Sequence, residues 1–140
     1  MDETERERQR AVAIVRKKLQ KEKQIEITDE DIEKYLSLDI NKLAIQALTT
    51  ATENGFYTPD NIDENSGNGM MEKLMLVVTE VAEAAEAVRV GDFENFQEEI
   101  ADTIIRLLDI CGACGIDIHS MIAIKMAINE KREKLHGKKM

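Results

Sequence analysis

The chain has 140 residues, 34% of them charged, and a formal net charge of −9 at pH 7. This acidic balance argues against general binding to nucleic acid or to an anionic membrane, because both favour a basic partner. One proline, seven glycines and 4% aromatic residues, in long stretches of helix-forming residues, predict an all-α protein with one compact domain overall.

Residues 1–40 are predicted to form an N-terminal helical extension. Residues 2–23 are highly charged and carry a thin apolar stripe, which is typical of a helix that packs on a neighbour or on another subunit. Thr28 followed by Asp31 predicts the start of a second, short helix. The chain begins without the apolar run of a signal peptide, and no uncharged stretch reaches ~18 residues. We therefore expect a soluble, cytoplasmic protein with no membrane partner.

Residues 41–54 repeat leucine and alanine at helical spacing, and Gly55 supplies a stop signal. Residues 56–69 are rich in Gly, Asn and Asp, which predicts the one long loop of the chain. A long loop in a compact domain is often functional. Phe56 and Tyr57 are two of five aromatic residues, and they either stack on a base or anchor the loop to the core.

Residues 71–109 have the pattern of two consecutive amphipathic helices separated by Gly91. Because only a short turn joins them, we expect an antiparallel helix hairpin. At 100° per residue, Glu80 falls inside the apolar arc of the first helix. A carboxylate in that position needs a partner, because burying an unpaired charge is costly.

In such a hairpin we expect two carboxylate pairs to face each other, Glu80-x-x-Glu83 on the first helix and Glu99-x-x-Asp102 on the second. Four converging carboxylates repel one another unless cations neutralise them. Oxygen ligands without Cys or His favour Mg²⁺, with Mn²⁺ as a second choice. The alternative is a solvated acidic face, but such a face usually mixes charge signs and would not place Glu80 among alanines.

Cys111 and Cys114 form a Cys-x-x-Cys pair, a spacing that also occurs in redox pairs and in half of a zinc site. No βαβ pattern surrounds the pair, and the sequence has no second one. Both sulfurs lie on the apolar side of the second helix, so we expect two core thiols.

Gly112 and Gly115 are predicted to mark a turn, and Asp117 to cap a last helix that runs to about Leu135. Cations and polar groups share one side of this helix within roughly 60° on the helical wheel: Lys125, Asn129, Arg132 and His136. Cations beside an apolar strip suit an anionic ligand. The alternative is a basic C-terminal turn that complements the helix dipole.

Glu133-x-x-His136 matches the iron-ligand spacing of carboxylate-bridged helical bundles. Those sites need two such motifs, and this sequence has one. A di-iron centre is therefore not expected.

In this order, the motifs resemble the MazG-like, all-α nucleoside triphosphate pyrophosphohydrolases. The resemblance covers residues 41–140, and residues 1–40 lie outside it. It consists of Glu80-x-x-Glu83, Glu99-x-x-Asp102 and Lys125-x-x-x-Asn129-x-x-Arg132-x-x-x-His136-Gly137-Lys138, with Gly55-Phe56-Tyr57 similar to the family's loop before the first metal-binding helix.

The resemblance implies a MazG-like helical bundle whose hairpin holds magnesium through the four acids. It implies hydrolysis of a (d)NTP to the nucleoside monophosphate and pyrophosphate, in the service of nucleotide-pool cleansing. Members work as homodimers or as dimer-of-dimers tetramers, so a second subunit can contribute to the site. The resemblance assigns substrate contacts to these residues: Lys125 and Arg132 on phosphates, Asn129 on the sugar or a phosphate, His136 and Lys138 in the same signature, and Phe56 and Tyr57 on the base.

Two positions depart from the family pattern. Many members carry a further Glu where this chain has Thr79, which leaves the general base open between Glu83 and Glu98. A proline often follows the family's arginine, where this chain has Glu133. The rival interpretation is a non-catalytic helical protein-interaction module that retains the bundle, and pyrophosphate release from a panel of (d)NTPs distinguishes the two.

Overall fold

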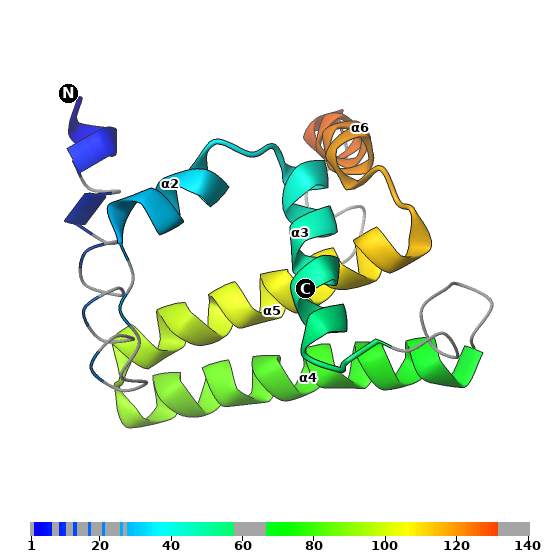
Figure 1. Ribbon diagram of the computed structural model, residues 1–140, viewed down its shortest axis with the longest axis horizontal. Helices are drawn as coiled ribbons and strands as arrows, with labels where there is room; N and C mark the ends of the chain where they lie inside the picture. Colours follow the sequence, from blue (N-terminus) through cyan, green and yellow to red (C-terminus); the bar gives the residue numbers. More distant parts are fainter. Residues whose placement is uncertain are drawn as a thin grey trace. The chain divides into compact units, whose positions relative to one another are not determined.

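A computed structural model describes residues 2–6, 9, 10, 13, 17, 21, 26, 28–57 and 67–131, without the side chains at 33, 35, 36, 67, 68, 127 and 129–131. The regular elements in this part of the chain are all α-helices (Figure 1): α2 (Asp29–Leu36), α3 (Ile40–Glu53), α4 (Gly67–Val90), α5 (Phe93–Cys114) and α6 (Ile118–Lys131). The expected all-α class is confirmed for these residues. Most of the helix predicted over residues 2–23 lies outside them.

Local sequence signals set the ends of these helices. At the start of α2, the Asp31 N–H donates to Thr28 Oγ1 (3.2 Å) and the Thr28 N–H donates to Asp31 Oδ2 (2.9 Å), as predicted for this pair. Gly55 and Gly91 follow α3 and α4 with φ of 83° and 76°. Glycine adopts this left-handed conformation without strain, so both predicted stops are confirmed.

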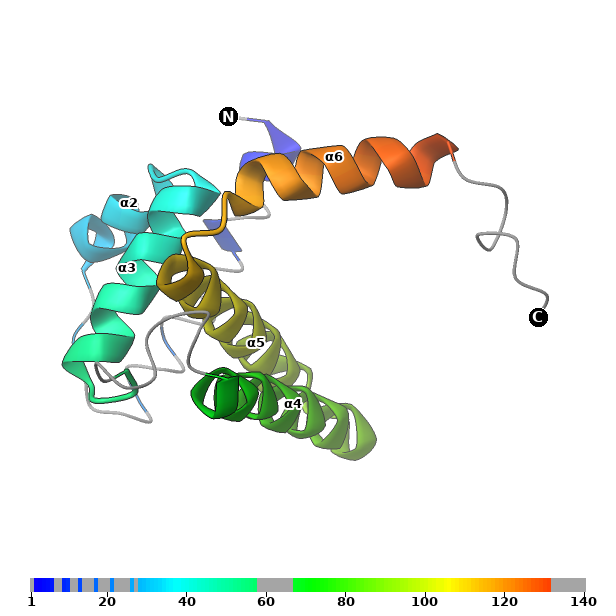
Figure 2. The ribbon, with the colours of Figure 1, turned by 90° about the vertical axis from the view of Figure 1, so that its right-hand side faces the viewer.

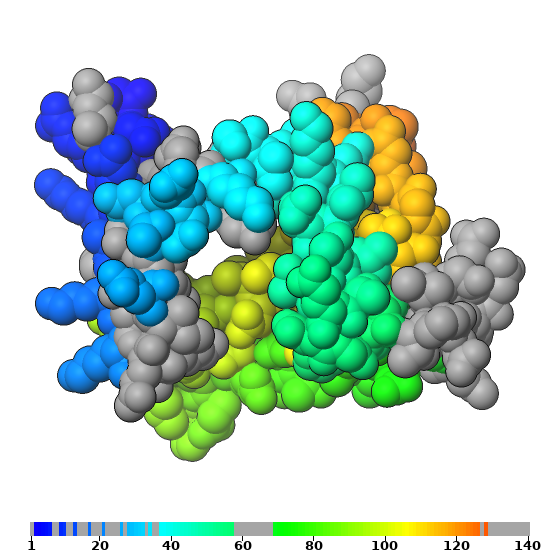
Figure 3. All heavy atoms as spheres, in the orientation of Figure 1, coloured from blue at the N-terminus to red at the C-terminus, as the bar shows by residue number. Residues whose placement is uncertain are grey.

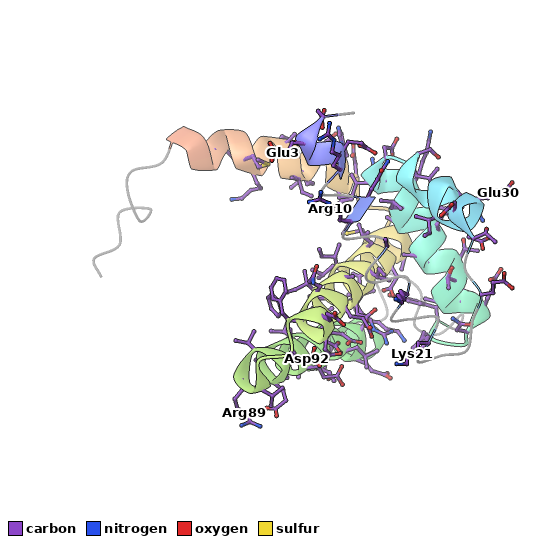
Figure 4. The ribbon with its side chains drawn as sticks, turned by 90° about the vertical axis from the view of Figure 1, so that its left-hand side faces the viewer. Glu3, Arg10, Lys21, Glu30, Arg89 and Asp92 are labelled. Atoms are coloured by element: carbon purple, nitrogen blue, oxygen red, sulfur yellow. The ribbon has the colours of Figure 1, made fainter. Side chains whose placement is uncertain are left out.

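The chain divides into two compact units, which we describe separately: Met1–Leu38 with Glu80–Asp102, and Asp39–Thr79 with Thr103–Met140. In the first unit, the last part of α4 and the first part of α5 run side by side on either side of the Gly91 turn (Figures 1 and 2). Figure 4 labels Asp92 in this turn, where its Oδ1 accepts the Asn95 N–H at 3.0 Å and caps α5. Gly91 thus ends α4, and Asp92 caps the start of α5.

The core of the second unit lies where α3 crosses the last part of α5, and atoms of α3 cover part of α5 in Figure 3. Ala44, Leu108 and Cys111 are its buried centre. Gly112 lies inside α5, and a Cβ built on it would be 2.7 Å from the Ala44 carbonyl oxygen. The expectation that Gly112 marks a turn is therefore wrong, because its role is to let two helix backbones approach closely. Gly115, with φ of 64°, follows the last residue of α5.

Asp117 caps α6 as predicted and also ties its start to α3. Asp117 Oδ1 accepts the Ser120 N–H at 3.0 Å and the Asn41 side-chain amide at 2.9 Å. Asn41 Oδ1 in turn accepts the His119 N–H at 3.1 Å. The described part of α6 ends at Lys131, so the predicted extension to about Leu135 falls outside the described residues.

α6 projects from α3 (Figure 2), and five large apolar side chains in its described part are exposed. Their exposed fractions lie between 40% and 66%: Met121, Ile122, Ile124, Met126 and Ile128. Within the described residues, no single helix is long and apolar enough to cross a membrane. The segments Phe93–Cys114 and Ile118–Met126 meet that requirement only together, as a pair bent by 115°.

Candidate functional site

Carboxylates gather in the first unit, where α4 and α5 flank their turn. Glu80, Glu83 and Glu99 each offer one oxygen, and these three oxygens lie within 4.8 Å of one another. Glu98, Glu99 and Asp102 form a second group with the same spacing. The structure thus brings the four predicted acids together, places Glu98 beside them, and makes Glu99 common to both groups.

Glu99 is the most buried of these acids, with 9% of its surface exposed. Burial raises the pKa of Glu99 to about 7, and the charge of Glu83 and hydrogen bonds with Glu83 and Glu80 add to the effect. The charge of Asp102 acts in the same direction. Helical spacing produces this crowding, because residues three apart on each helix face the same neighbour.

One carboxylate oxygen of Glu98, Oε1, beside the predicted ligands, is buried and has no hydrogen-bond partner among the described residues. An orphaned buried acceptor is costly, and a cation satisfies it.

The donor set fits a hard divalent cation. Both groups consist of carboxylate oxygens alone, the ligands that Mg²⁺ and Mn²⁺ prefer. Two oxygens on opposite sides of a Mg²⁺ ion at ~2.1 Å are about 4.2 Å apart. A spread of at most 4.8 Å therefore needs only small side-chain adjustments.

The two aromatic residues predicted to contact a base lie in the second unit and differ in burial. Tyr57 is only 3% exposed, and its O–H donates to Asp109 Oδ1 at 2.6 Å. The ammonium of Lys73 lies 4.7 Å from the centre of the Tyr57 ring. In this structure Tyr57 therefore anchors the start of the loop to the interior, which is one of the two roles that the sequence left open.

Phe56 is half-exposed, with 40% of its surface accessible. The guanidinium carbon of Arg106 lies 4.5 Å from the centre of its ring, a cation–π distance. The backbone carbonyl of Phe56 accepts a hydrogen bond from the Lys73 ammonium. A base-contacting role stays a prediction for both Phe56 and Tyr57.

Of the predicted substrate-binding residues in the C-terminal signature, only the first two belong to the described part of the chain. Lys125 lies on α6 and is exposed. Asn129 is part of α6, but its side chain is outside the description. Arg132, His136 and Lys138 lie wholly outside the described residues. The contiguous basic stripe therefore stays a prediction from helical periodicity.

The two cysteines of the Cys-x-x-Cys pair are not joined by a disulfide. Cys111 is buried in the core of the second unit, and Cys114 is partly buried. Burial raises the pKa of the Cys111 thiol, with the neighbouring Cys114 as a second cause, so this thiol is poorly suited to nucleophilic or redox chemistry. The expectation of a core thiol is confirmed for Cys111, whereas Cys114 is only partly buried.

Sequence reasoning missed the group that surrounds Tyr57. Lys73 is only 5% exposed and Asp109 only 4% exposed, although both are charged residue types. Lys73 precedes Glu80 by seven residues, which places both on one face of α4. That spacing was the available signal, because a lysine on a face of alanines and leucines needs an internal partner.

Comparisons of the chain with protein-family models, with curated proteins and with solved structures found no match.

Proposed function

We propose that the chain is a magnesium-dependent nucleotide pyrophosphohydrolase that converts a (d)NTP to the nucleoside monophosphate and pyrophosphate. The observation that carries the proposal is the pair of overlapping carboxylate groups, which share the buried Glu99. The ordered motifs that resemble the MazG-like enzymes support it, because they supply acids for a metal and cations for a polyphosphate in one chain.

Glu80, Glu83, Glu99 and Asp102 would hold Mg²⁺, with Mn²⁺ as a substitute. A bound divalent ion neutralises charge that develops on phosphate oxygens. Glu98 or Glu83 would take the proton of the attacking water as its oxygen adds to the α-phosphorus. The bond from that phosphorus to the bridging oxygen then breaks, and pyrophosphate leaves. Glu98 has the stronger claim to the proton, because its Oε1 is buried without a hydrogen bond in the described structure.

The proposal assigns the substrate's negative charge to the cations of the C-terminal signature. Lys125 and Arg132 would contact phosphate oxygens, with His136 and Lys138 beside them and Asn129 on the sugar or a phosphate. A homodimer, or a tetramer built from dimers, would complete the site. Nucleotide-pool cleansing in the cytoplasm is the process that this reaction would serve.

The test is pyrophosphate release from a panel of (d)NTPs, with magnesium and with excess chelator. We expect magnesium-dependent turnover of at least one nucleotide, with the nucleoside monophosphate and pyrophosphate in equal amounts. Release of inorganic phosphate and a nucleoside diphosphate would contradict the assigned bond. No turnover of any (d)NTP with magnesium or manganese would overturn the proposal.

The second candidate is a non-catalytic helical interaction module, and the exposed apolar side chains of α6 favour it. Such a module would use α6 to bind a protein partner and would not need the acidic cluster. Under this alternative, Glu80→Gln would leave function unchanged, whereas charged substitutions on α6 would remove it.

A further inference from the structure

The second unit buries three polar side chains that the proposed reaction does not use. Lys73, Tyr57 and Asp109 are each at most 5% exposed. Tyr57 lies between the other two, with the Lys73 ammonium 4.7 Å from the centre of its ring and Asp109 Oδ1 accepting its O–H at 2.6 Å. Lys73 also donates to the backbone carbonyl of Phe56.

The stability of the fold alone does not require this buried polar arrangement. Removing an ammonium and a carboxylate from water is costly, and well-packed apolar side chains of similar volume often serve a core as well or better. The polar contacts do, however, fix the orientation of the residues that they hold. They hold two consecutive residues at once, Phe56 by its carbonyl and Tyr57 by its hydroxyl and ring.

The outcome of this restraint is visible at Phe56. Gly55, with φ of 83°, follows α3, and of the next two residues Tyr57 is buried whereas Phe56 keeps 40% of its surface exposed. The Arg106 guanidinium lies 4.5 Å from the centre of the Phe56 ring and restrains it further. An exposed aromatic ring fixed from two sides loses little conformational entropy when it stacks on a ligand.

We propose that Lys73, Tyr57 and Asp109 are positioning residues that form a clamp and hold Phe56 as a stacking surface for the planar base of a nucleotide. Tyr57 itself does not contact the ligand in this assignment. The inference rests on the proposed function for the identity of the ligand class, and it adds the residues that prepare the base contact.

The chain contains no tryptophan, so Phe56→Trp places a single tryptophan at the stacking surface. Each (d)NTP is added stepwise to this variant in a buffer that contains calcium, and the tryptophan emission is recorded. We expect saturable quenching by at least one nucleotide. Lys73→Met and Asp109→Asn in this background should each raise the apparent Kd at least about fivefold, which corresponds to about 1 kcal/mol. Glu72→Gln, an exposed change beside Lys73, is the matched control and should leave the Kd unchanged.

Two comparisons separate positioning from a merely structural role. Tyr57→Phe keeps the aromatic ring and removes only the hydroxyl, so it raises the Kd if the clamp matters and leaves it unchanged if Tyr57 stacks on the base. The Lys73→Met/Asp109→Asn double variant removes both buried charges, so its Tm should lie closer to the parent than that of either single variant. Its Kd should stay raised, whereas a purely structural role would restore Kd together with Tm.

Calorimetric titration of the same nucleotides into chains that keep Phe56 repeats the comparison without the tryptophan. Absence of saturable quenching in a Phe56→Trp variant that still releases pyrophosphate would overturn the stacking surface and leave the proposed function standing. Saturable quenching in the Phe56→Trp variant, together with no pyrophosphate release by the wild type, would support the stacking surface and overturn the proposed function. An unchanged Kd in both single clamp variants would overturn the clamp.

Discussion

Glu80 and Asp102 are the residues at which the metal proposal is most directly tested. Glu80→Gln and Asp102→Asn each remove one charge from the acidic cluster without changing side-chain volume. We expect each to nearly abolish pyrophosphate release while the helical circular dichroism signal survives. Magnesium should raise the Tm of the wild type, because a ligand of the native state stabilises it by mass action, and both variants should lose most of that shift.

Glu72→Gln is the matched control for this pair, since Glu72 is an exposed acid on the same helix outside both carboxylate groups. It should retain both activity and the magnesium shift. Wild-type turnover by either cluster variant at saturating magnesium would rule out that residue as a ligand.

Lys125 and Arg132 test the predicted basic stripe at single residues. They are seven positions, or about two helical turns, apart, so they can reach successive phosphates if the helix continues. We expect Arg132→Ala to lower kcat/KM for the best (d)NTP at least roughly tenfold, or about 1.4 kcal/mol, because a planar bidentate donor is lost. Lys125→Ala should weaken catalysis in the same direction, with magnesium binding little changed.

Lys131→Ala is the internal control, because it projects about 100° away from Arg132 on the helical wheel. Equal effects at Lys131 and Arg132, or none at either, would mean that the stripe only complements the helix dipole.

Spacing along the chain predicted which acids meet, but not which residues enclose Tyr57. Glu80 with Glu83 and Glu99 with Asp102 are local pairs, so the helical period fixes their faces and one short turn brings the faces together. Tyr57, Lys73 and Asp109 come from three segments. Their contacts depend on how helices cross, which local periodicity does not encode.

At the scale of elements, the ends of helices were predictable because capping and left-handed turns depend on a few adjacent residues. Thr28 with Asp31, Gly55, Gly91 and Asp117 act in the structure as their residue types predict. Gly112 was misassigned for the complementary reason. A glycine required by close helix packing has the same local signature as a glycine in a turn, and only the crossing of α3 over α5 distinguishes them.

Gly112→Ala tests this close approach. Alanine stabilises a helix by about 1 kcal/mol relative to glycine. At this position its Cβ would be 2.7 Å from the Ala44 carbonyl oxygen and 3.0 Å from Leu48 Cβ. Overpacking of a core costs about 1–3 kcal/mol, so the clash should outweigh the propensity gain. Urea unfolding should show a net loss of stability.

Ala101→Gly, an exposed change in the same helix, measures the propensity contribution alone. A Gly112→Ala variant more stable than the wild type would show that α3 can shift aside without cost.

Asp117 gives the link between α3 and α6 a pH dependence. Hydrogen bonds from the Asn41 amide, then from Ser120, lower the pKa of Asp117 from 3.8 to about 2. A depressed carboxyl pKa means that the folded state prefers the charged form. The stabilisation is therefore present above pH 4 and is lost as the pH falls from about 4 to about 2.

The comparison that isolates this group is wild type against Asp117→Asn in urea unfolding at several pH values. The difference in midpoint should be largest near pH 5 and should shrink towards pH 2. A difference that does not vary with pH would show that the charge of Asp117 contributes nothing.

At the scale of the whole molecule, the question is what covers the apolar face of α6. Composition and periodicity predicted the α-helical class, because both depend on residues that are near in sequence. They also predicted apolar faces on α6, but not whether this chain itself covers them. Five large apolar side chains in the described part of α6 are exposed.

Self-association is the expected consequence, as the resemblance to dimeric and tetrameric enzymes also implies. Sedimentation velocity at micromolar concentration should give a species of at least twice the 15.9 kDa of one chain. Each copy carries a net charge of −9, so like-charge repulsion opposes association and apolar contacts must outweigh it. Added salt screens the repulsion and leaves apolar contacts intact, so the dimer should dissociate less at higher ionic strength.

Ile124→Glu should weaken the dimer strongly, whereas Thr49→Glu, an equal change of charge at an exposed position of α3, should weaken it little. A monomer at all salt concentrations, or equal effects of the two substitutions, would show that α6 is not the contact between copies.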